Sequence, residues 1–386
     1  MPWKEVSIMS ARYEFVRLAT QEGANIRQLC RRSGISPTTG YKLLVRFQTQ
    51  GAAGLRDRSR KPETSPHRTP LALERRILTL RDTHPRWGAR KLWARLKALG
   101  HTGLPTPSTI QAILTRHGRI DPTQSRKHQA FIRFEHEAPN DLWQMDFKGH
   151  FALGRGRCHP LTVLDDHSRF SVCLSACANE QGVTVQARLT DTFRSYGLPD
   201  RMTMDNGSPW GDDAGHPYTP VTVWLLRLGI RVSHSRPYHP QTQGKDERFH
   251  RTLNTELLQG RVFATLAETQ SAFDAWRAVY NLERPHEALS LQPPISRYAP
   301  STRSFPEVMP PIEYGPTDIV RKVQAKGEFS FHNHSFRIAK AFRGYPVALR
   351  PTNEDGLWNV FFCMHAVASI NLKSDLTDKP YVPHYL

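Results

Sequence analysis

The order of predicted strands and helices after residue 140 restricts the fold more than any other feature of this sequence. Three strand candidates follow one another with short turns, in LWQMDFKGHFAL, HPLTVLDDHS and RFSVCLSA, which predicts an antiparallel meander. A helix is expected over about 180–196. Next come a strand in RMTMDN, a helix in TPVTVWLLRLG, a strand in IRVSHS and a long helix in KDERFHRTLNTELL. Residues 131–300 are therefore predicted to form one α/β domain.

This element order is that of a ribonuclease-H-like fold, in which the first and fourth strands lie side by side. Three acidic residues fall at positions that this topology brings together. Asp146 lies in the first strand among apolar residues, Asp205 ends the fourth strand, and Glu247 lies in the first turn of the last helix. Alone, each has an ordinary explanation: a salt bridge or strand end, an Asp-Asn-Gly turn, and a surface helix residue. Together, they are expected to converge near the strand ends.

Three carboxylates in one site repel one another unless divalent cations hold them. Oxygen ligands of this kind suit Mg²⁺ or Mn²⁺. Two such ions, roughly 3.5–4 Å apart, would activate an attacking oxygen and stabilise the leaving oxygen of a phosphodiester. The three acids therefore predict metal-dependent phosphoryl transfer on DNA, with two ions in each active site.

The positive charge is concentrated before residue 131. Residues 1–130 hold 25 Lys and Arg against 8 Asp and Glu, a net charge of +17, whereas residues 131–300 and 301–386 carry −1 and +2. A basic region of this size is the electrostatic footprint of a protein that binds a phosphate backbone. The alternative is a solvated surface that keeps the protein soluble.

Two helix-turn-helix units are predicted in this basic region, over 1–53 and 71–130. In the first, Ser36 and Pro37 begin a helix whose inner face is expected to carry Tyr41, Leu44 and Val45. In the second, Thr106 and Pro107 begin a helix with Ile110, Ile113 and Leu114 inside, after an apolar stripe at Ala89, Leu92, Trp93 and Leu96. The residues expected to face outward and read DNA are Thr38, Thr39, Lys42 and Arg46 in the first unit, and Ser108, Gln111 and Thr115 in the second. Ordinary helical hairpins would explain the apolar positions alone.

The linker over 54–70 is rich in Arg, Pro and Ser, which predicts an extended segment. Its basic residues could enter a DNA minor groove between the two helical units, or could simply be solvated. They are Arg56, Arg58, Arg60 and Lys61. Residues 301–386 contain short strand-like runs separated by Gly and Pro, and a small β-barrel is predicted there.

The rest of the composition excludes two classes of protein. There is no apolar run near the ~18 residues needed to cross a bilayer, and no secretory signal, so we expect a cytoplasmic protein. The five cysteines are scattered without a C-x-x-C pair, which argues against a disulfide framework or a Cys-rich zinc site. We expect them to be small buried hydrophobic residues.

Four motifs in order resemble the integrase core of insertion-sequence transposases, most closely the insertion sequence 481 and insertion sequence 3 groups. They are LWQMDFKG, the DNGS run at 205–208, HPQTQGKDERFHRTL at 239–253 and YNLERPHEAL at 280–289. This resemblance implies a DDE transposase with a retroviral-integrase-type core, in which Asp146, Asp205 and Glu247 are the catalytic acids. The tandem helical units extend the resemblance to nearly the whole chain.

The sequence departs from the group's pattern in one spacing. Between Asp205 and Glu247 lie 41 residues, several more than is typical, and the extra length is expected in PWGDDAGHPY. Asp212 and Asp213 in that run are predicted to lie in a surface loop instead of binding metal. There is also no His-His-Cys-Cys zinc module like that of retroviral integrases, so recognition of DNA ends should depend on the helical units.

Residues beside the acids have weaker assignments. Asp165 and Asp166 in DDHSR are expected to form a structural turn. Lys245, Arg248 and Arg251 flank Glu247 and could hold the DNA backbone, or be solvated. The signature Tyr280, Asn281, Arg284, Pro285 and His286 is expected to pack a helix end on the core, and His286 is not expected to act as a base.

The sequence thus predicts a bacterial, nucleoid-associated DNA transposase, active as a homodimer or higher oligomer. Residues 1–130 would bind the terminal inverted repeats of the element. The core would cut the element end, and the exposed 3′-hydroxyl would attack target DNA. The alternative hypotheses are a non-catalytic DNA-binding regulator and a ribonuclease-H-type nuclease. The repeat sequence, the target preference, the oligomer number, the role of the C-terminal region and the choice between excision and copying stay open.

Overall fold

The computed structural model of the chain describes residues 7–58, 68–120, 135–211, 218–234 and 244–373, and divides into two compact units, 1–68 and 69–386. Arg60, Lys61, Asp212 and Asp213, for which the sequence analysis makes predictions, lie outside the described residues. Within the described ranges, no helix is both long and apolar enough to cross a membrane.

The described part of the first unit consists of three α-helices and a short 3₁₀ turn. They are α1 (Ile8–Ala19), α2 (Ile26–Arg32), α3 (Pro37–Gln50) and η1 (Gly51–Leu55). Helix α1, which was not predicted, contributes Phe15 and Val16 to the core. The Ser36 side chain accepts a hydrogen bond from the Thr39 amide at 3.2 Å, and Pro37 occupies the first turn of α3. The predicted start of this helix is confirmed.

The prediction that Tyr41, Leu44 and Val45 form the inner face of α3 is wrong for two of these residues. Tyr41 and Val45 are 49% and 58% exposed, whereas Leu43, Leu44 and Gly40 are buried. Gly40 lets α3 approach α2 closely, because a Cβ at this position would lie 2.4 Å from the Cys30 sulfur of α2. The close approach sets the rotation of α3 and turns Tyr41 and Val45 toward solvent.

A second three-helix group begins the second unit. It comprises α4 (Leu71–Thr83), α5 (Ala89–Ala98) and α6 (Pro107–Arg116). The predicted apolar residues Leu92, Leu96 and Ile110 are buried together with Ile77 of the unpredicted helix α4. The Thr106 side chain accepts a hydrogen bond from the Thr109 amide at 3.4 Å and caps α6, as the Thr-Pro pair predicted.

The α/β core contains the sheet expected from the element order. Its strands are β1 (Trp143–Phe147), β2 (Phe151–Ala152), β3 (Arg157–Asp165), β4 (Ser171–Cys177), β5 (Arg201–Met204) and β6 (Arg231–His234). The order across the sheet is β2-β3-β1-β5-β6, with β4 paired to β3. Strand β1 is antiparallel to β3 and parallel to β5. The first and fourth predicted strands therefore lie side by side, as expected.

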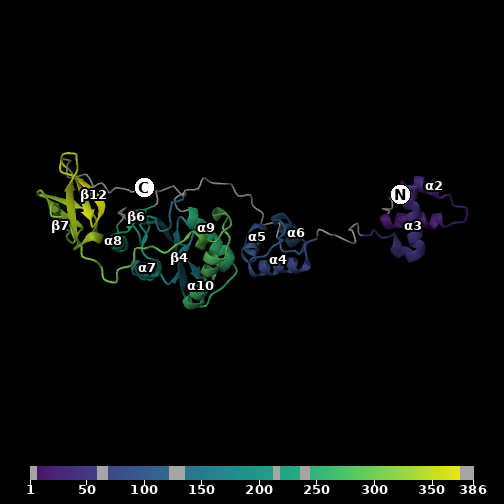
Figure 1. Ribbon diagram of the computed structural model, residues 1–386, viewed down its shortest axis with the longest axis horizontal. Coiled ribbons are helices and arrows are strands. Elements are labelled where there is room, and N and C mark those ends of the chain that lie inside the picture. Colours follow the sequence, from purple (N-terminus) through teal and green to yellow (C-terminus); the bar gives the residue numbers. More distant parts are fainter. Residues whose placement is uncertain (1–6, 59–67, 121–134, 212–217, 235–243, 374–386) are drawn as a thin grey trace, which may run out of the picture. The chain divides into compact units, whose positions relative to one another are not determined.

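Helices cover both faces of this sheet (Figure 1). One face packs on α7 (Gly182–Tyr196) and α8 (Pro220–Arg227). The other packs on α9 (Gly244–Leu253), the π-helical turn η4 (Asn254–Leu258) and α10 (Leu266–Leu282). Phe249, Leu253 and Leu257 are buried in this second layer at the predicted four-residue steps.

The C-terminal residues form a sheet and a hairpin. Strands β7 (Ile319–Lys322), β10 (Pro346–Pro351), β11 (Leu357–Phe362) and β12 (His365–Asn371) make a four-stranded sheet in the order β12-β11-β10-β7. Strands β8 (Glu328–Phe331) and β9 (His334–Arg337) pair with each other. Among the described residues no pairing closes these strands into a ring, so the predicted barrel is not confirmed.

Candidate active site

Asp146 and Asp205 are brought together by the register of two parallel strands. Trp143 pairs with Met202 and Gln144 pairs with Thr203. Continuing this register by two residues places Asp205, which directly follows β5, beside Asp146. Because side chains alternate along a strand, and Trp143 and Met145 pack on the α7–α8 side, Asp146 faces the α9–α10 layer.

The two carboxylates share a partly buried, negatively charged environment. Burial, and then the charge of Asp205, raises the pKa of Asp146 to about 7. Burial also raises the pKa of Asp205, although the Gly207 amide donates a hydrogen bond to its Oδ1 at 3.2 Å. His234 Nδ1 donates to the Asp205 backbone oxygen at 2.8 Å and fixes the strand end.

Glu247 lies on the exposed side of the first turn of α9. Across the ranges that the structure describes, no three or more His, Cys, Asp or Glu side chains are arranged to hold a metal ion. The strand register therefore brings two of the three predicted acids together, and Glu247 does not join them in a three-acid group among the described residues. Joint metal binding by all three stays a prediction.

The neighbouring residue Asp246 points the other way. It is 1% exposed, and neither carboxylate oxygen has a hydrogen-bond partner among the described residues. Burial, and then the charges of Asp146 and Asp166, raises its pKa well above the usual range. Asp246 was not among the predicted site residues, although it precedes Phe249 and Leu253 by three and seven residues, the helical spacing of an inward-facing position.

Two polar contacts hold α9 against the sheet. Thr162 on β3 donates its hydroxyl to the Asp146 backbone oxygen at 2.9 Å, and the same oxygen atom of Thr162 lies 2.8 Å from His250 Nε2. Lys245 forms an ion pair with Asp166 and also donates to the Asp166 backbone oxygen at 3.2 Å. The first turns of α9 are thus tied to the strand that carries Asp146.

Asp165 has the structural role expected of it. Its oxygens accept hydrogen bonds from the Ser168 amide at 2.7 Å, the Ser168 hydroxyl at 2.5 Å and the Asn140 amide at 2.7 Å. These bonds close the turn between β3 and β4. Asp166 is also satisfied, since Gln144 Nε2 donates to it at 2.8 Å beside the Lys245 ion pair.

Glu180, which was also not among the predicted site residues, lies close enough to act on both acids. Its negative charge helps to raise the pKa of Asp146 and that of Asp205. His159 Nδ1 lies 2.8 Å from Glu180 Oε1 and orients the side chain. No local motif marks Glu180, because its position depends on how β3 and β4 pair.

The YNLERPHEAL signature packs the end of α10 on the core, as predicted. Asn281 accepts a hydrogen bond from the Ser171 amide and donates one to the Ser171 carbonyl, at 2.8 and 3.0 Å. Arg284 pairs with Glu256 of η4 at 2.9 Å, and both side chains are largely buried. Burial lowers the pKa of His286 well below its usual range.

The predicted DNA-binding residues differ in their surroundings. Lys245 is turned inward to Asp166, so a direct contact with DNA requires that this ion pair opens. Arg248, Arg251, Arg56 and the helix residues Thr38, Thr39, Lys42 and Thr115 are exposed, while Arg46 is half-buried. Arg58 is exposed and donates to Gln50 at 2.9 Å.

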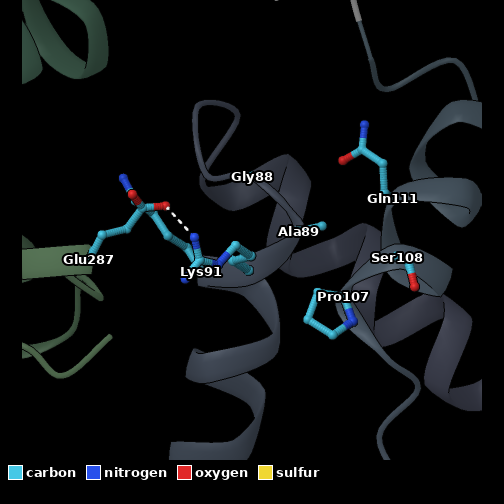
Figure 2. A pocket seen from close by; sticks show the side chains of 8 residues that line it. Gly88, Ala89, Lys91, Pro107, Ser108, Gln111 and Glu287 are labelled. Carbon is cyan, nitrogen blue, oxygen red and sulfur yellow. Dashed lines mark hydrogen bonds and ion pairs between the residues drawn. The ribbon is translucent and has the colours of Figure 1, made fainter. Parts of the chain in front are cut away.

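Ser108 and Gln111 of α6 line a pocket of about 400 Å³ (Figure 2). Arg90 and Lys91 of α5 lie on another side, and Arg90 forms an ion pair with Glu287 at 3.4 Å. A second ion pair joins Arg95 to Glu283 at 2.5 Å. None of the three predicted acids lines the pocket, so it is separate from the acidic site.

Family models match most regions of the chain. An integrase core domain matches residues 136–240 and a second integrase core model matches 228–294. The C-terminal domain of IS481 family transposases matches residues 318–378. A helix-turn-helix domain matches residues 11–63, and a homeodomain-like domain matches 39–114.

Similar proteins include two from insertion elements. The uncharacterized 31.7 kDa protein of insertion element IS407 from Burkholderia multivorans is 26% identical over 63% of this chain and 86% of its own length. The uncharacterized 39.2 kDa protein of insertion element IS476 from Xanthomonas euvesicatoria is 27% identical over 58% of this chain and 63% of its own length.

Solved structures similar to this chain include a viral intasome and an integrase catalytic core domain. A chain of the simian T-cell lymphotropic virus intasome, solved with PP2A regulatory subunit B56 gamma, is 17% identical with a TM-score of 0.37, over 74% of this chain and 96% of that chain. The HTLV-2 integrase catalytic core domain in complex with magnesium is 15% identical with a TM-score of 0.32, over 42% and 97%. Together with the family matches, the sequence relatives confirm the predicted resemblance: the chain carries an integrase core domain followed by the C-terminal domain of IS481 family transposases.

Proposed function

We propose that this chain is a DNA transposase whose core cuts and joins DNA at the ends of a mobile element. The observation that carries the proposal is the placement of Asp146 on β1 beside Asp205, which directly follows the adjacent parallel strand β5; both are partly buried and alike in charge. Within the described residues, neither acid forms an ion pair with a Lys or Arg side chain. Such a pair is costly unless a cation neutralises it.

The chemistry of these oxygen ligands fits Mg²⁺ or Mn²⁺. Asp146 and Asp205 would hold the ions, with Glu247 from the first turn of α9 completing the set. When bound, two such ions would activate the attacking oxygen and stabilise the leaving oxygen at phosphorus. Water would be the attacking group in end cleavage, and the element's 3′-hydroxyl would attack target DNA in strand transfer.

Other residues would position the acids and the DNA. The Thr162–His250 contact and the Lys245–Asp166 ion pair hold α9 against β3, which pairs with β1, and the turn that follows β3. Arg248 and Arg251 are exposed on the same helix, where they would contact DNA phosphates beside the acids. Truncating either arginine would weaken DNA binding without altering the acids.

Recognition of the terminal inverted repeats would fall to the two three-helix groups within residues 1–130. Helices α3 and α6 would enter major grooves, with Thr38, Lys42, Ser108 and Gln111 near base edges. Joining both ends to one target needs two attacking hydroxyls, and each chain contributes one set of Asp146, Asp205 and Glu247. The active species would therefore be a homodimer or higher oligomer.

The first prediction is that Asp146→Asn, Asp205→Asn and Glu247→Gln each abolish end cleavage and strand transfer. Each change removes a charged ligand with little change of shape, and the lost stabilisation of several kcal/mol corresponds to roughly a thousand-fold or more in rate. Cleavage of labelled element ends in Mg²⁺ and in Mn²⁺ measures the effect, and binding to the same ends should be retained.

Asp191→Asn is the matched control, because Asp191 is an exposed carboxylate on α7. It should cleave like the wild-type protein. Substantial turnover by any of the three variants would remove that residue from the site. If the wild-type protein binds the ends but never cleaves them with either metal, the chain is a DNA-binding regulator and the proposal is wrong.

A further inference from the structure

The strongest unexplained feature of the core is the buried carboxylate of Asp246. Both of its oxygens are shielded from solvent and have no hydrogen-bond donor among the described residues. An unpaired carboxylate in a protein interior is expensive, by several kcal/mol even after relaxation. The residue therefore needs a positive charge or a proton that the described side chains do not supply.

The charges nearest to Asp246 make this need greater. Asp146 and Asp166 both repel its charge, while Lys245 attracts it. The Lys245 ammonium group, however, is already bound by the carboxylate and the backbone oxygen of Asp166. The nearby cation is therefore shared with a second acid, and the cluster keeps an excess of negative charge.

A second buried oxygen without a donor lies on the strand that α9 covers. Gln144 donates its Nε2 to Asp166, but its Oε1 has no partner among the described residues. Gln144 and Asp146 are two residues apart on β1, so they point to the same face of the sheet, the one that packs on α9. Gln144 Oε1 on β1 and the carboxylate oxygens of Asp246 on α9 are therefore all buried, without a hydrogen-bond donor in the described ranges, where this helix packs on the sheet.

We propose that Asp246 is an additional ligand of the cation site formed with Asp146. The first turn of α9 would then present two acids to the metal centre, Asp246 from its buried side and Glu247 from its exposed side. A divalent cation would satisfy both oxygens of Asp246 and offset its repulsion by Asp146. This inference rests on the proposed metal-dependent function and adds a residue to its site.

The alternative is that Asp246 stays protonated and donates its proton to an acceptor such as Gln144 Oε1. The two arrangements predict different effects of replacing Asp246 on the stabilisation that a bound cation gives. A metal ligand contributes to cation binding, so its loss weakens the stabilisation that a bound cation gives to the folded state. A neutral acid would leave that stabilisation unchanged.

The test is thermal unfolding of the full-length protein with and without Mn²⁺, for the wild-type protein, Asp246→Asn and Asp205→Asn. We expect Mn²⁺ to raise the unfolding temperature of the wild-type protein and to raise that of both variants much less. We also expect Asp246→Asn to unfold at a higher temperature than the wild-type protein without metal, because it removes an acidic group that is buried without a hydrogen-bond partner among the described residues. The exposed control Asp191→Asn should respond like the wild-type protein.

The outcomes separate this inference from the proposed function. If Mn²⁺ raises the unfolding temperature of Asp246→Asn as much as that of the wild-type protein, but does not raise that of Asp205→Asn, Asp246 is not a ligand. The proposed metal site would still stand. A wild-type protein that does not respond to Mn²⁺, or an Asp205→Asn variant that responds fully, would contradict the proposed site itself.

A second variant gives a direct spectroscopic signature. In Asp246→Cys, a thiolate at this position would bind Cd²⁺ and produce a sulfur-to-cadmium charge-transfer band in the ultraviolet, above the baseline of the five native cysteines. Asp191→Cys should give no such band at one equivalent of Cd²⁺. A folded Asp246→Cys protein without the band would also overturn the inference.

Discussion

Two clusters of buried or partly buried charge lie on the side of the sheet that α9 and α10 cover, and they differ in how their charges are matched. In one cluster, Arg284 forms an ion pair with Glu256, and Trp276 Nε1 donates to the same carboxylate at 3.3 Å. In the other, Asp146, Asp205 and Asp246 are all acids. The first cluster is matched within the chain, whereas none of the three acids in the second forms an ion pair with a Lys or Arg side chain of the described residues.

The difference separates structural from functional charge. A matched pair can hold a helix end in place, and nothing further needs to bind there. An unmatched set of acids lowers the stability of the folded protein, and it is typical of sites that bind a ligand of opposite charge. Variants of the Arg284–Glu256 cluster should therefore mainly lower the stability of the folded protein. Variants of the acidic cluster should mainly weaken cation binding.

The largest effect on stability is expected for Arg284→Met. Removing this guanidinium leaves Glu256 buried without its partner, which should lower the free energy of unfolding by about 3–5 kcal/mol. Urea denaturation measures the loss. Arg194→Met, which breaks the exposed ion pair with Glu307, is the control and should lower the free energy of unfolding much less, because solvent screens this pair. Equal losses in the two variants would show that the Arg284 cluster does not hold the helix end.

A smaller, pH-dependent effect is expected from His250. A protonated His250 would supply the positive charge that the acids lack, but burial, and then the charge of Lys148, lowers its pKa to about 4. The folded protein then stays unprotonated at His250 while the unfolded chain, with a histidine pKa near 6.5, takes up a proton. Stability from this residue is complete above about pH 6.5 and is lost as the pH falls toward about 4.

The variant His250→Gln tests this linkage, since it removes the titrating ring and keeps a polar group near the Thr162 hydroxyl. We expect the fall in unfolding free energy between pH 7 and pH 5 to be smaller than in the wild-type protein by about 1–2 kcal/mol. An unchanged fall would mean that His250 is protonated in the folded state and already partly neutralises the acids.

The smallest effect is expected for Asp146→Asn without divalent cations. Removing one of two adjacent, partly buried negative charges should raise the free energy of unfolding by about 1 kcal/mol. Asp165→Asn is the contrasting control, because Asp165 accepts hydrogen bonds from three donors and its replacement should destabilise the protein. A loss of stability in Asp146→Asn would show that its charge is matched in the folded chain.

Local sequence patterns were enough to predict much of this protein. The strand and helix order of the core, the helix starts at Ser36 and Thr106, and the four-residue steps of Phe249 and Leu253 were all confirmed. These features depend on a residue and its near neighbours: a capping hydroxyl, a first-turn proline, or apolar side chains at the period of a helix. Neighbouring positions for Asp146 and Asp205 followed from the element order alone.

Tertiary structure decided which side chains turn inward. The close approach at Gly40 exposes Tyr41 and Val45, the ion pair with Asp166 turns Lys245 away from solvent, and the packing of α9 buries Asp246 instead of Glu247. The influence of Glu180 on both acids depends on the pairing of β3 with β4. Each outcome depends on a segment distant in sequence, because rotation and register are set by contacts that no local pattern encodes.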